Sequence, residues 1–301
     1  MRTGRLRPVR RGVYRIDDAG DLTAGSAHVL RARAATPHVA GDAAFGHVTA
    51  ALALRLPVWG LPLDRLHLVR ERARGGGRVR RGTRVHRAPL PPGDVVEWQG
   101  LRLTSPAWTL ADLARSVSAE RALVTRDAAL HERVRRRPPS EPPGPGVTTV
   151  DRVAGVLDRF AGRRGVPAAR RVLDLADARC ESPGESRSRF RMHLAGLPPP
   201  ATRWVVPDLG FRTDFAWPER GVVGEFDGRV KCGRALKPGQ DVGEVLCEEK
   251  RREDRIRATG LVVVRWVWSD LTDGTLLARL GAALRHPVAS RGAPRDGCHA
   301  G

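Results

Sequence analysis

The chain has 301 residues, enough for two domains with hydrophobic cores of their own, and it carries 53 Lys and Arg against 33 Asp and Glu, a net charge of +20. Its three lysines are Lys231, Lys237 and Lys250, so 50 of the cations are arginine. GC-rich codon usage explains the ratio of Arg to Lys, but it does not explain the excess of cations. The excess favours a polyanionic partner, because arginine binds phosphate through two parallel hydrogen bonds.

Several classes of protein are excluded by composition. The sequence has no run of about 18 or more apolar residues, as a membrane-spanning helix would need, and its N-terminus lacks the apolar segment of a signal peptide. The four cysteines are far apart, without a CxxC pair or histidines at ligand spacing, which argues against a zinc site or a disulfide framework. We therefore expect a cytoplasmic protein with no membrane segment.

A proline-rich segment, RPPSEPPGPG (137–146), lies between two helix-like stretches and cannot itself continue a helix. Charge is uneven across it: residues 1–140 carry 26 Arg and 12 acids, a net charge of +14, and the rest of the chain carries +6. We predict five parts in chain order: a basic α/β region over 1–137, a linker over 138–147, connecting helices over 148–180, a second domain over 181–286 and a disordered tail over 287–301.

The basic region has a mixed α/β pattern. Periodicity and capping residues predict helices at about 24–35, 48–54 and 118–134, a helix opened by Ser105-Pro106, and strands at about 64–70 and 78–88. No catalytic constellation stands out. Five histidines lie on different predicted elements, and we interpret each as a structural or surface residue: His28, His38, His47, His67 and His86.

The second domain has a clearer order of elements. Ser182-Pro183 opens a helix that ends at Gly196, before three consecutive prolines. The segments that follow predict strands at 203–207, 211–217 and 222–228, a charged helix at about 240–259, an inner strand at 261–268 and a closing helix from Ser269 to Leu284. The fold class is therefore α/β (α+β), with a second domain of αβββαβ order.

Carboxylates occur in two neighbouring strands of this domain. Strand alternation places Glu225 and Asp227 on one face, and Asp214 lies in the middle of the preceding strand. An antiparallel pairing would bring Asp214 beside Glu225, and a divalent cation such as Mg²⁺ or Mn²⁺ would relieve their repulsion. Two alternatives stay open: Asp227-Gly228 is also a turn signal, and Asp214 could instead pair with an arginine.

Glu185 has two interpretations of equal weight. Ser182-Pro183-Gly184-Glu185 fits a capping box, in which the glutamate bonds back to the backbone at the start of the helix. Alternatively, Glu185 faces the sheet and is an outer metal ligand.

This order of elements and acids resembles the PD-(D/E)XK nuclease superfamily, and most closely its branch related to the very-short-patch mismatch-repair endonuclease. More narrowly, the chain over about 175–285 resembles a set of uncharacterised proteins from high-GC bacteria, in which this domain follows a region similar to AbiEi-type antitoxins. The segments that carry this narrower resemblance are ESPGESR, TDFAWPE, GEFDGRVK, EEKRRED and VVVRW. The N-terminal region resembles AbiEi-type antitoxins through RRGVY (10–14), HVTAALALRLPVWGLP (47–62) and LTSPAWTLADLA (103–114). Such antitoxins begin with a winged helix-turn-helix, and this chain begins at the basic strand that would follow its helices, so we expect a truncated winged-helix start.

The nuclease resemblance implies a metal site and a catalytic site. It implies that Asp214 and Glu225 hold Mg²⁺ or Mn²⁺ and that Glu185 supports the ion or orients water. The superfamily has a lysine two residues after the second acid, where this chain has Asp227. The candidate catalytic residues are therefore Glu185, Asp214, Glu225 and Asp227, with Lys231 or Lys250 in place of the missing lysine.

Two functions follow from these observations. The first is a Mg²⁺-dependent DNA endonuclease or nickase that hydrolyses phosphodiesters, with DNA phosphates positioned by Arg187, Arg191, Arg229 and Arg251. The alternative is a non-catalytic DNA-binding regulator of the AbiEi antitoxin type, with a degenerate nuclease domain and a possible toxin partner.

Overall fold

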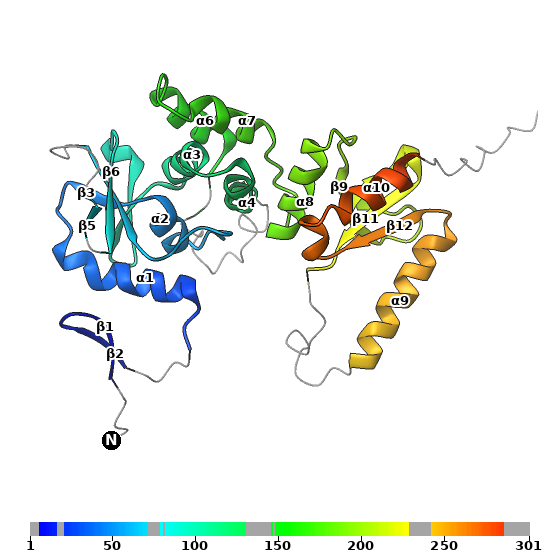
Figure 1. The fold of residues 1–301 in the computed structure, drawn as a ribbon, viewed down its shortest axis with the longest axis horizontal. Coiled ribbons are helices and arrows are strands. Elements are labelled where there is room, and N and C mark those ends of the chain that lie inside the picture. Colours follow the sequence, from blue (N-terminus) through cyan, green and yellow to red (C-terminus); the bar gives the residue numbers. More distant parts are fainter. Residues whose placement is uncertain are drawn as a thin grey trace, which may run out of the picture. The chain divides into compact units, whose positions relative to one another are not determined.

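A computed structural model describes residues 6–16, 21–71, 79, 80, 82–130, 146, 148–228 and 242–285. The chain divides into two compact units, Met1–Ser186 and Arg187–Gly301 (Figure 1). Both contain helices and strands, so the predicted α/β class is confirmed. The predicted linker lies outside the described residues except for Gly146, and so does the predicted tail.

The first unit opens with a two-stranded antiparallel ribbon and continues with a mixed six-stranded sheet. The ribbon consists of β1 (Leu6–Arg10) and β2 (Val13–Ile16). The sheet has the order β5-β6-β4-β3-β8-β7. Its strands are β3 (Ala43–Phe45), β4 (Leu66–Arg70), β5 (Val79–Arg80), β6 (Thr83–Arg87), β7 (Val95–Trp98) and β8 (Leu101–Thr104).

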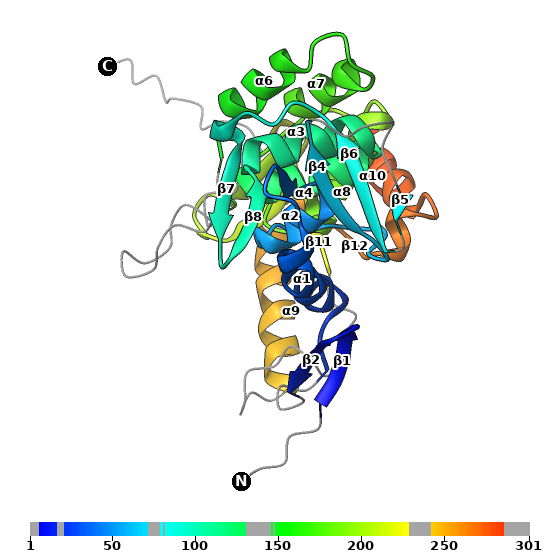
Figure 2. The same cartoon turned by 90° about the vertical axis from the view of Figure 1, so that its left-hand side faces the viewer.

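The helices of the first unit pack around a central one, α3. They are α1 (Ala24–Ala35), α2 (His47–Ala53), α3 (Pro106–Ser116), α4 (Ala119–Leu130), α6 (Val150–Arg159) and α7 (Val166–Asp174), with short 3-10 turns η1 (Thr36–His38) and η2 (Pro92–Asp94). Helix α3 contacts α2, α4, α6 and α7 (Figures 1 and 2). The predicted connecting helices, α6 and α7, therefore belong to the first unit.

The start of α3 shows why this helix begins where it does. Ser105 is the N-cap, and its side-chain oxygen accepts a hydrogen bond from the backbone N–H of Trp108. Pro106 occupies the first helical position, where a missing N–H costs nothing. Nine of the residues of α3 are buried, including Trp108, which makes an edge-to-face contact with Phe160. The helix is thus the core around which the unit is built.

The second unit, whose boundary with the first falls within α8 (Pro183–Leu194), follows the predicted αβββαβ order. After α8 come β9 (Ala201–Val205), β10 (Arg212–Trp217), η3 (Pro218–Arg220), β11 (Val222–Phe226), α9 (Val242–Ala258), β12 (Val262–Trp266), η4 (Ser269–Leu271) and α10 (Thr275–Arg285). The sheet has the order β12-β11-β10-β9. Strands β9, β10 and β11 pair antiparallel, and β11 and β12 pair parallel across the α9 crossover.

The two faces of this sheet bury different amounts of apolar surface. One face packs against α8 and α10 in a core that includes Met192, Phe215, Trp217, Trp266 and Leu280. The indole Nε1–H of Trp266 donates to the hydroxyl of Ser188 at 2.7 Å, which satisfies its polar atom inside that core. The face toward α9 has a smaller cluster, made of Val206, Ala216, Val223 and Ile256.

Among the described residues, no helix is both long enough and apolar enough to cross a membrane.

Gly224 gives a direct test of how tightly the larger core is packed. A Cβ at this position would lie 2.6 Å from Cη2 of Trp266 and 3.4 Å from Cβ of Phe215. Because overpacking a dense core forces neighbouring groups apart, we expect Gly224→Ala to lower the free energy of unfolding by about 1–3 kcal/mol. Urea denaturation of the full chain measures this change.

The control is Gly155→Ala in α6, where an added Cβ meets nothing within 4 Å. This variant should be as stable as the parent, or more stable by about 0.5–1 kcal/mol, because alanine favours helix. Equal stability of the parent and the Gly224→Ala variant would show that the core has spare room.

Candidate functional site

Two of the predicted carboxylates, Asp214 and Glu225, lie on neighbouring strands of the second sheet, on the face toward α9. The β10–β11 register pairs Phe215 with Gly224, and one step further along it Asp214 lies opposite Glu225. The parallel β11–β12 register pairs Glu225 with Arg265. Side chains in register on neighbouring strands are adjacent, so Asp214, Glu225 and Arg265 form one row.

The carboxylate of Asp214 is engaged with the backbone of the next strand. Its Oδ2 accepts a hydrogen bond from the N–H of Phe226 at 2.8 Å. This bond lies just beyond the last backbone pair of β10 and β11, so the Asp214 side chain replaces a backbone acceptor there. Asp214 is half-buried, and the bond satisfies an N–H that would otherwise lose its partner at the edge of the pairing.

Both oxygens of Glu225 bind arginine. Oε1 accepts from Nη2 of Arg252 at 2.9 Å, and Oε2 accepts from Nη2 of Arg265 at 2.7 Å. The Glu225 side chain is only 12% exposed, so these charge-assisted bonds replace most of its hydration. The sequence predicted a divalent ion beside Glu225, and the structure places two guanidinium groups against its oxygens.

Arg265 binds two further carboxylates from α9. Its Nη1 lies 2.6 Å from Oε1 of Glu249, and its Nε lies 3.0 Å from Oε2 of Glu253. Burial acts to lower the pKa of Arg265, but the hydrogen bond with Glu249 and the charges of the surrounding glutamates outweigh it and raise the pKa above its ordinary value. We call this set the Arg265 network: Glu225, Glu249, Arg252, Glu253 and Arg265.

The donor set does not fit the divalent ion expected from the sequence. Glu225 has both oxygens in arginine contacts, and Asp214 has one oxygen on a backbone N–H. A Mg²⁺ ion needs near-octahedral oxygen ligation, and an ion bound to Glu225 would meet the positive charges of Arg252 and Arg265, which already contact this carboxylate. In the described ranges, no group of three or more His, Cys, Asp or Glu is arranged to hold a metal ion.

Glu185 makes the contacts of the capping alternative. Its Oε1 accepts from the hydroxyl of Ser182 at 2.7 Å, and its Oε2 accepts from the N–H of Glu181 at 2.9 Å. In return the Glu185 N–H donates to the Ser182 oxygen at 3.2 Å. This reciprocal pattern is that of a capping box at the start of α8. In a standard capping box Glu185 would accept from the N–H of Ser182, and here it accepts from the N–H of Glu181 instead.

The remaining candidates for catalysis do not converge with Asp214 and Glu225 in a described contact. The N–H of Asp227, just past the end of β11, donates to the carbonyl of Trp266 at 2.8 Å, and both the catalytic and the turn interpretation of Asp227 stay predictions. Lys250 is exposed on α9. Lys231 lies outside the described residues.

The four arginines predicted to contact phosphates are in different settings. Arg187 is only 3% exposed, and its guanidinium lies 5.5 Å from the centre of the Trp268 ring, a cation–π contact rather than an outward-facing one. Arg191 is half-buried and Arg251 is exposed. Arg229 lies outside the described residues.

The first unit contains a cluster that the sequence reasoning missed. The rings of His47 on α2, His67 on β4 and His86 on β6 stack with centroids 4.4, 5.0 and 5.4 Å apart and with planes within 24° of one another. Nδ1 of His67 lies 2.9 Å from Nε2 of His86. We call these three residues the histidine stack. These two nitrogens of His67 and His86 face each other in a hydrogen bond, and the stack is not among groups arranged to hold a metal ion in the described part of the chain.

The surroundings of the stack keep its imidazoles neutral. Burial, together with the charges of His86 and Arg84, lowers the pKa of His47 to about 3. Burial and the neighbouring histidines lower the pKa of His67 to about 3. The nearby Asp112 is fully buried, and burial raises the pKa of its carboxyl. The interpretation of these histidines as structural therefore agrees with their packing.

Comparison with known proteins gives a family match for part of the first unit. Residues 21–141 match the family model of the AbiEi antitoxin C-terminal domain, which confirms the N-terminal resemblance and makes this part of the chain an AbiEi antitoxin-like domain. The match begins after the β1–β2 ribbon and includes α1 to α4 and the whole six-stranded sheet. The nuclease resemblance of the second unit stays a prediction.

Two relatives extend this similarity. The chain is 33% identical over 190 residues to the uncharacterised Mycobacterium tuberculosis proteins MT2308, of strain CDC 1551, and Rv2248, of strain H37Rv. The alignment covers 62% of this chain and 62% of each relative, so the chain spans less than two thirds of their length. No solved structure matches the chain.

The histidine stack makes the stability of the protein depend on pH. The folded state holds His47 neutral down to a pKa of about 3, whereas the unfolded chain protonates it near 6.5. The stabilisation is therefore complete above pH 6.5 and is lost as the pH falls toward 3. We expect His47 alone to account for a loss of about 2 kcal/mol in the free energy of unfolding between pH 7 and pH 5.

Urea denaturation at a series of pH values measures this loss. The variant His47→Gln should flatten the dependence between pH 7 and pH 5. The variant His38→Gln, at an exposed position, should leave it unchanged. A parent protein whose stability is the same at pH 7 and pH 5 would contradict the neutral stack.

Proposed function

We propose that this protein is a non-catalytic, DNA-binding regulator of the antitoxin type, which neutralises a toxin partner through its AbiEi antitoxin-like domain. In this proposal the second unit keeps the element order of a nuclease without its metal site. The observation that carries the proposal is the Arg265 network, which occupies the position of the expected cation in a chain that also contains an antitoxin-like domain.

The network argues against catalysis on energetic grounds. Metal-dependent hydrolysis needs a divalent ion that generates hydroxide and stabilises the charge of the transition state. To bind that ion, Glu225 would have to leave two guanidinium groups and so uncover partly buried charges. The lysine expected two residues after Glu225 is replaced by Asp227, which adds negative charge where the reaction needs positive charge.

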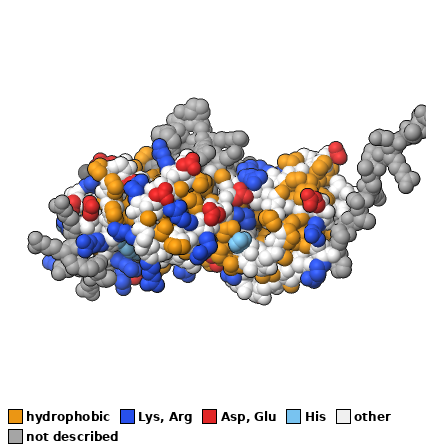
Figure 3. Space-filling model, turned by 90° about the horizontal axis from the view of Figure 1, so that it is seen from above, with side chains coloured by type: hydrophobic (Ala, Val, Ile, Leu, Met, Phe, Trp, Pro, Cys, Tyr) orange, Lys and Arg blue, Asp and Glu red, His pale blue; other side chains and the backbone are white. Residues whose placement is uncertain are grey.

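Several features support binding to DNA. The net charge of +20 attracts a polyanion. On the face in Figure 3, Lys and Arg side chains lie among acidic and apolar ones and form no single stripe, so the support for DNA binding comes from the net charge and not from a basic patch on this face. The ribbon β1–β2 carries exposed Arg7, Arg10 and Arg11, and a two-stranded ribbon fits the major groove.

One observation favours the nuclease as a second candidate. The αβββαβ order is present, and Asp214 lies opposite Glu225 on one face of its sheet, as the nuclease resemblance implies. The two functions make opposite predictions for DNA incubated with a divalent metal, so one series of experiments separates them.

We expect the full chain to bind a DNA duplex with an affinity that falls steeply as salt rises, because each neutralised phosphate releases counterions. The double variant Arg7→Ala and Arg11→Ala should reduce the slope of log affinity against log salt by about 2, since about one unit is lost with each phosphate contact. The control is Arg65→Ala with Arg170→Ala, two arginines paired with Asp64 and Asp158. Fluorescence anisotropy measures both slopes.

The same protein should leave supercoiled plasmid intact in Mg²⁺ or Mn²⁺, and the Asp214→Ala variant should behave identically. Nicking that requires the metal and disappears in the Asp214→Ala variant would establish the nuclease instead. Failure of the parent protein to bind the duplex at low salt would overturn the DNA-binding part of the proposal.

A further inference from the structure

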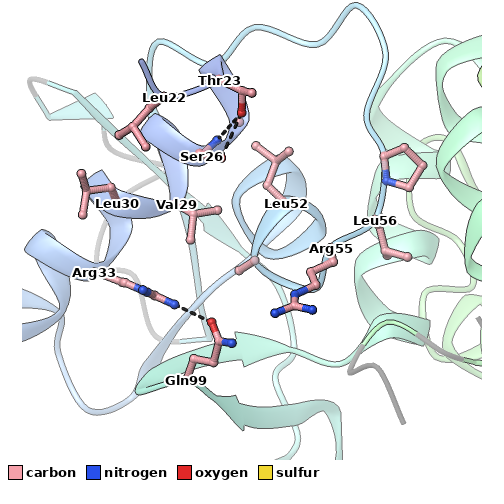
Figure 4. A pocket seen from close by; sticks show the side chains of 13 residues that line it. Leu22, Thr23, Ser26, Val29, Leu30, Arg33, Leu52, Arg55, Leu56 and Gln99 are labelled. Atoms are coloured by element: carbon pink, nitrogen blue, oxygen red, sulfur yellow. Dashed lines mark hydrogen bonds between the residues drawn. The ribbon is translucent and has the colours of Figure 1, made fainter. Parts of the chain in front are cut away.

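A pocket of about 560 Å³ lies in the first unit, between α1, the end of α2 and the β7–β8 turn (Figure 4). Most of its lining is aliphatic and includes Leu22, Val29, Leu30, Leu52 and Leu56. None of the lining residues is acidic. The pocket is therefore an apolar depression within a basic protein.

Three polar side chains define one side of this pocket. Nη2 of Arg33 donates a hydrogen bond to the side-chain oxygen of Gln99. Figure 4 shows the guanidinium groups of Arg33 and Arg55 approaching Gln99 from opposite sides. Both arginines are exposed. Arg33 and Arg55 thus border the apolar floor of the pocket, and the side-chain amide of Gln99 holds Arg33 in place.

The backbone fixes the positions of two of these groups. Arg55 and Gln99 have φ angles of 60° and 48°, in the left-handed region that residues other than glycine rarely adopt. The Arg55 N–H is bonded to the carbonyl of Leu52 at 3.0 Å, which holds this conformation at the end of α2. The side chain of Arg55 therefore starts from a constrained backbone rather than from a freely rotating loop.

We propose that this pocket binds a segment of a partner protein in which an apolar side chain lies next to an Asp or Glu. The apolar side chain fills the leucine-lined floor, and the carboxylate bridges the guanidinium groups of Arg33 and Arg55. Charge complementarity selects an acidic partner, because residues 1–140 have a net charge of +14. A nucleic acid would satisfy the arginines but would leave the aliphatic floor unfilled.

This inference rests on the proposed function and deepens it, since it names the surface through which an antitoxin-type protein would hold a partner protein. It does not involve the β1–β2 ribbon or the Arg265 network. Its test is therefore separate from the DNA-binding assay.

The test selects random dodecapeptides, displayed on phage, against the immobilised full chain. We expect the enriched peptides to share an apolar residue beside Asp or Glu. The strongest one is then synthesised with a fluorescent label, and its Kd is measured by anisotropy. Reversing the charge in Arg55→Glu should weaken binding by about tenfold or more, because a carboxylate then faces a carboxylate. The control Arg87→Glu, at an exposed arginine outside the lining, should change the Kd by less than about twofold.

A second variant fills the pocket without touching the core. Ser26 is exposed on α1 and lines the pocket, so Ser26→Trp should block the peptide while leaving the circular dichroism spectrum and DNA binding unchanged. Enriched peptides without the acidic residue, equal binding by the Arg55→Glu and Arg87→Glu variants, or no enrichment at all would each overturn the inference. Peptide binding by a chain that fails to bind DNA would leave the inference standing and refute the DNA-binding part of the proposed function.

Discussion

The contact between Arg265 and its three glutamates holds the second unit together on the face toward α9. It ties β12 to β11 through Glu225 and ties α9 to the sheet through Glu249 and Glu253. The apolar cluster on this face is small, and Ile256 is its buried contribution from the described part of α9. Ion pairs therefore stabilise this face of the sheet, whereas apolar burial stabilises the opposite face. The same ion pairs engage the carboxylate oxygens that a divalent ion would need.

Much of the second unit could be predicted from local signals. The Ser182-Pro183 start and the three prolines after Gly196 bounded α8, and turn residues separated apolar runs that became β9 to β11. In the first unit, β3, β7 and β8 were missed. Each has only three or four residues, which is too short for an alternating pattern to be recognised. Their places in the six-stranded sheet depend on pairings between segments that are distant in the sequence.

The candidate site was predicted in part for the same reason. Strand alternation is local, and it placed Glu225 and Asp227 on one face, whereas the position of Asp214 opposite Glu225 also required the assumption that the two strands pair antiparallel. The partner of Glu225 did not follow from the sequence, because Arg265 lies within an apolar run and only the parallel register of β11 and β12 brings the two together. The sequence did indicate that Arg265 needs a partner, because it is a charged residue within the apolar run VVVRW (262–266). The histidine stack joins α2, β4 and β6, and no spacing along the chain marks it.

The central claim is that guanidinium groups, rather than a divalent ion, neutralise Glu225. A double-mutant cycle with Glu225→Gln and Arg265→Met, measured by urea unfolding of the full chain in EDTA and again in Mg²⁺, tests it most directly. We expect a coupling energy of roughly 1–3 kcal/mol that is the same in both buffers. Additive effects in EDTA, or a stabilisation of the parent by Mg²⁺ that disappears in the Glu225→Gln variant, would contradict it.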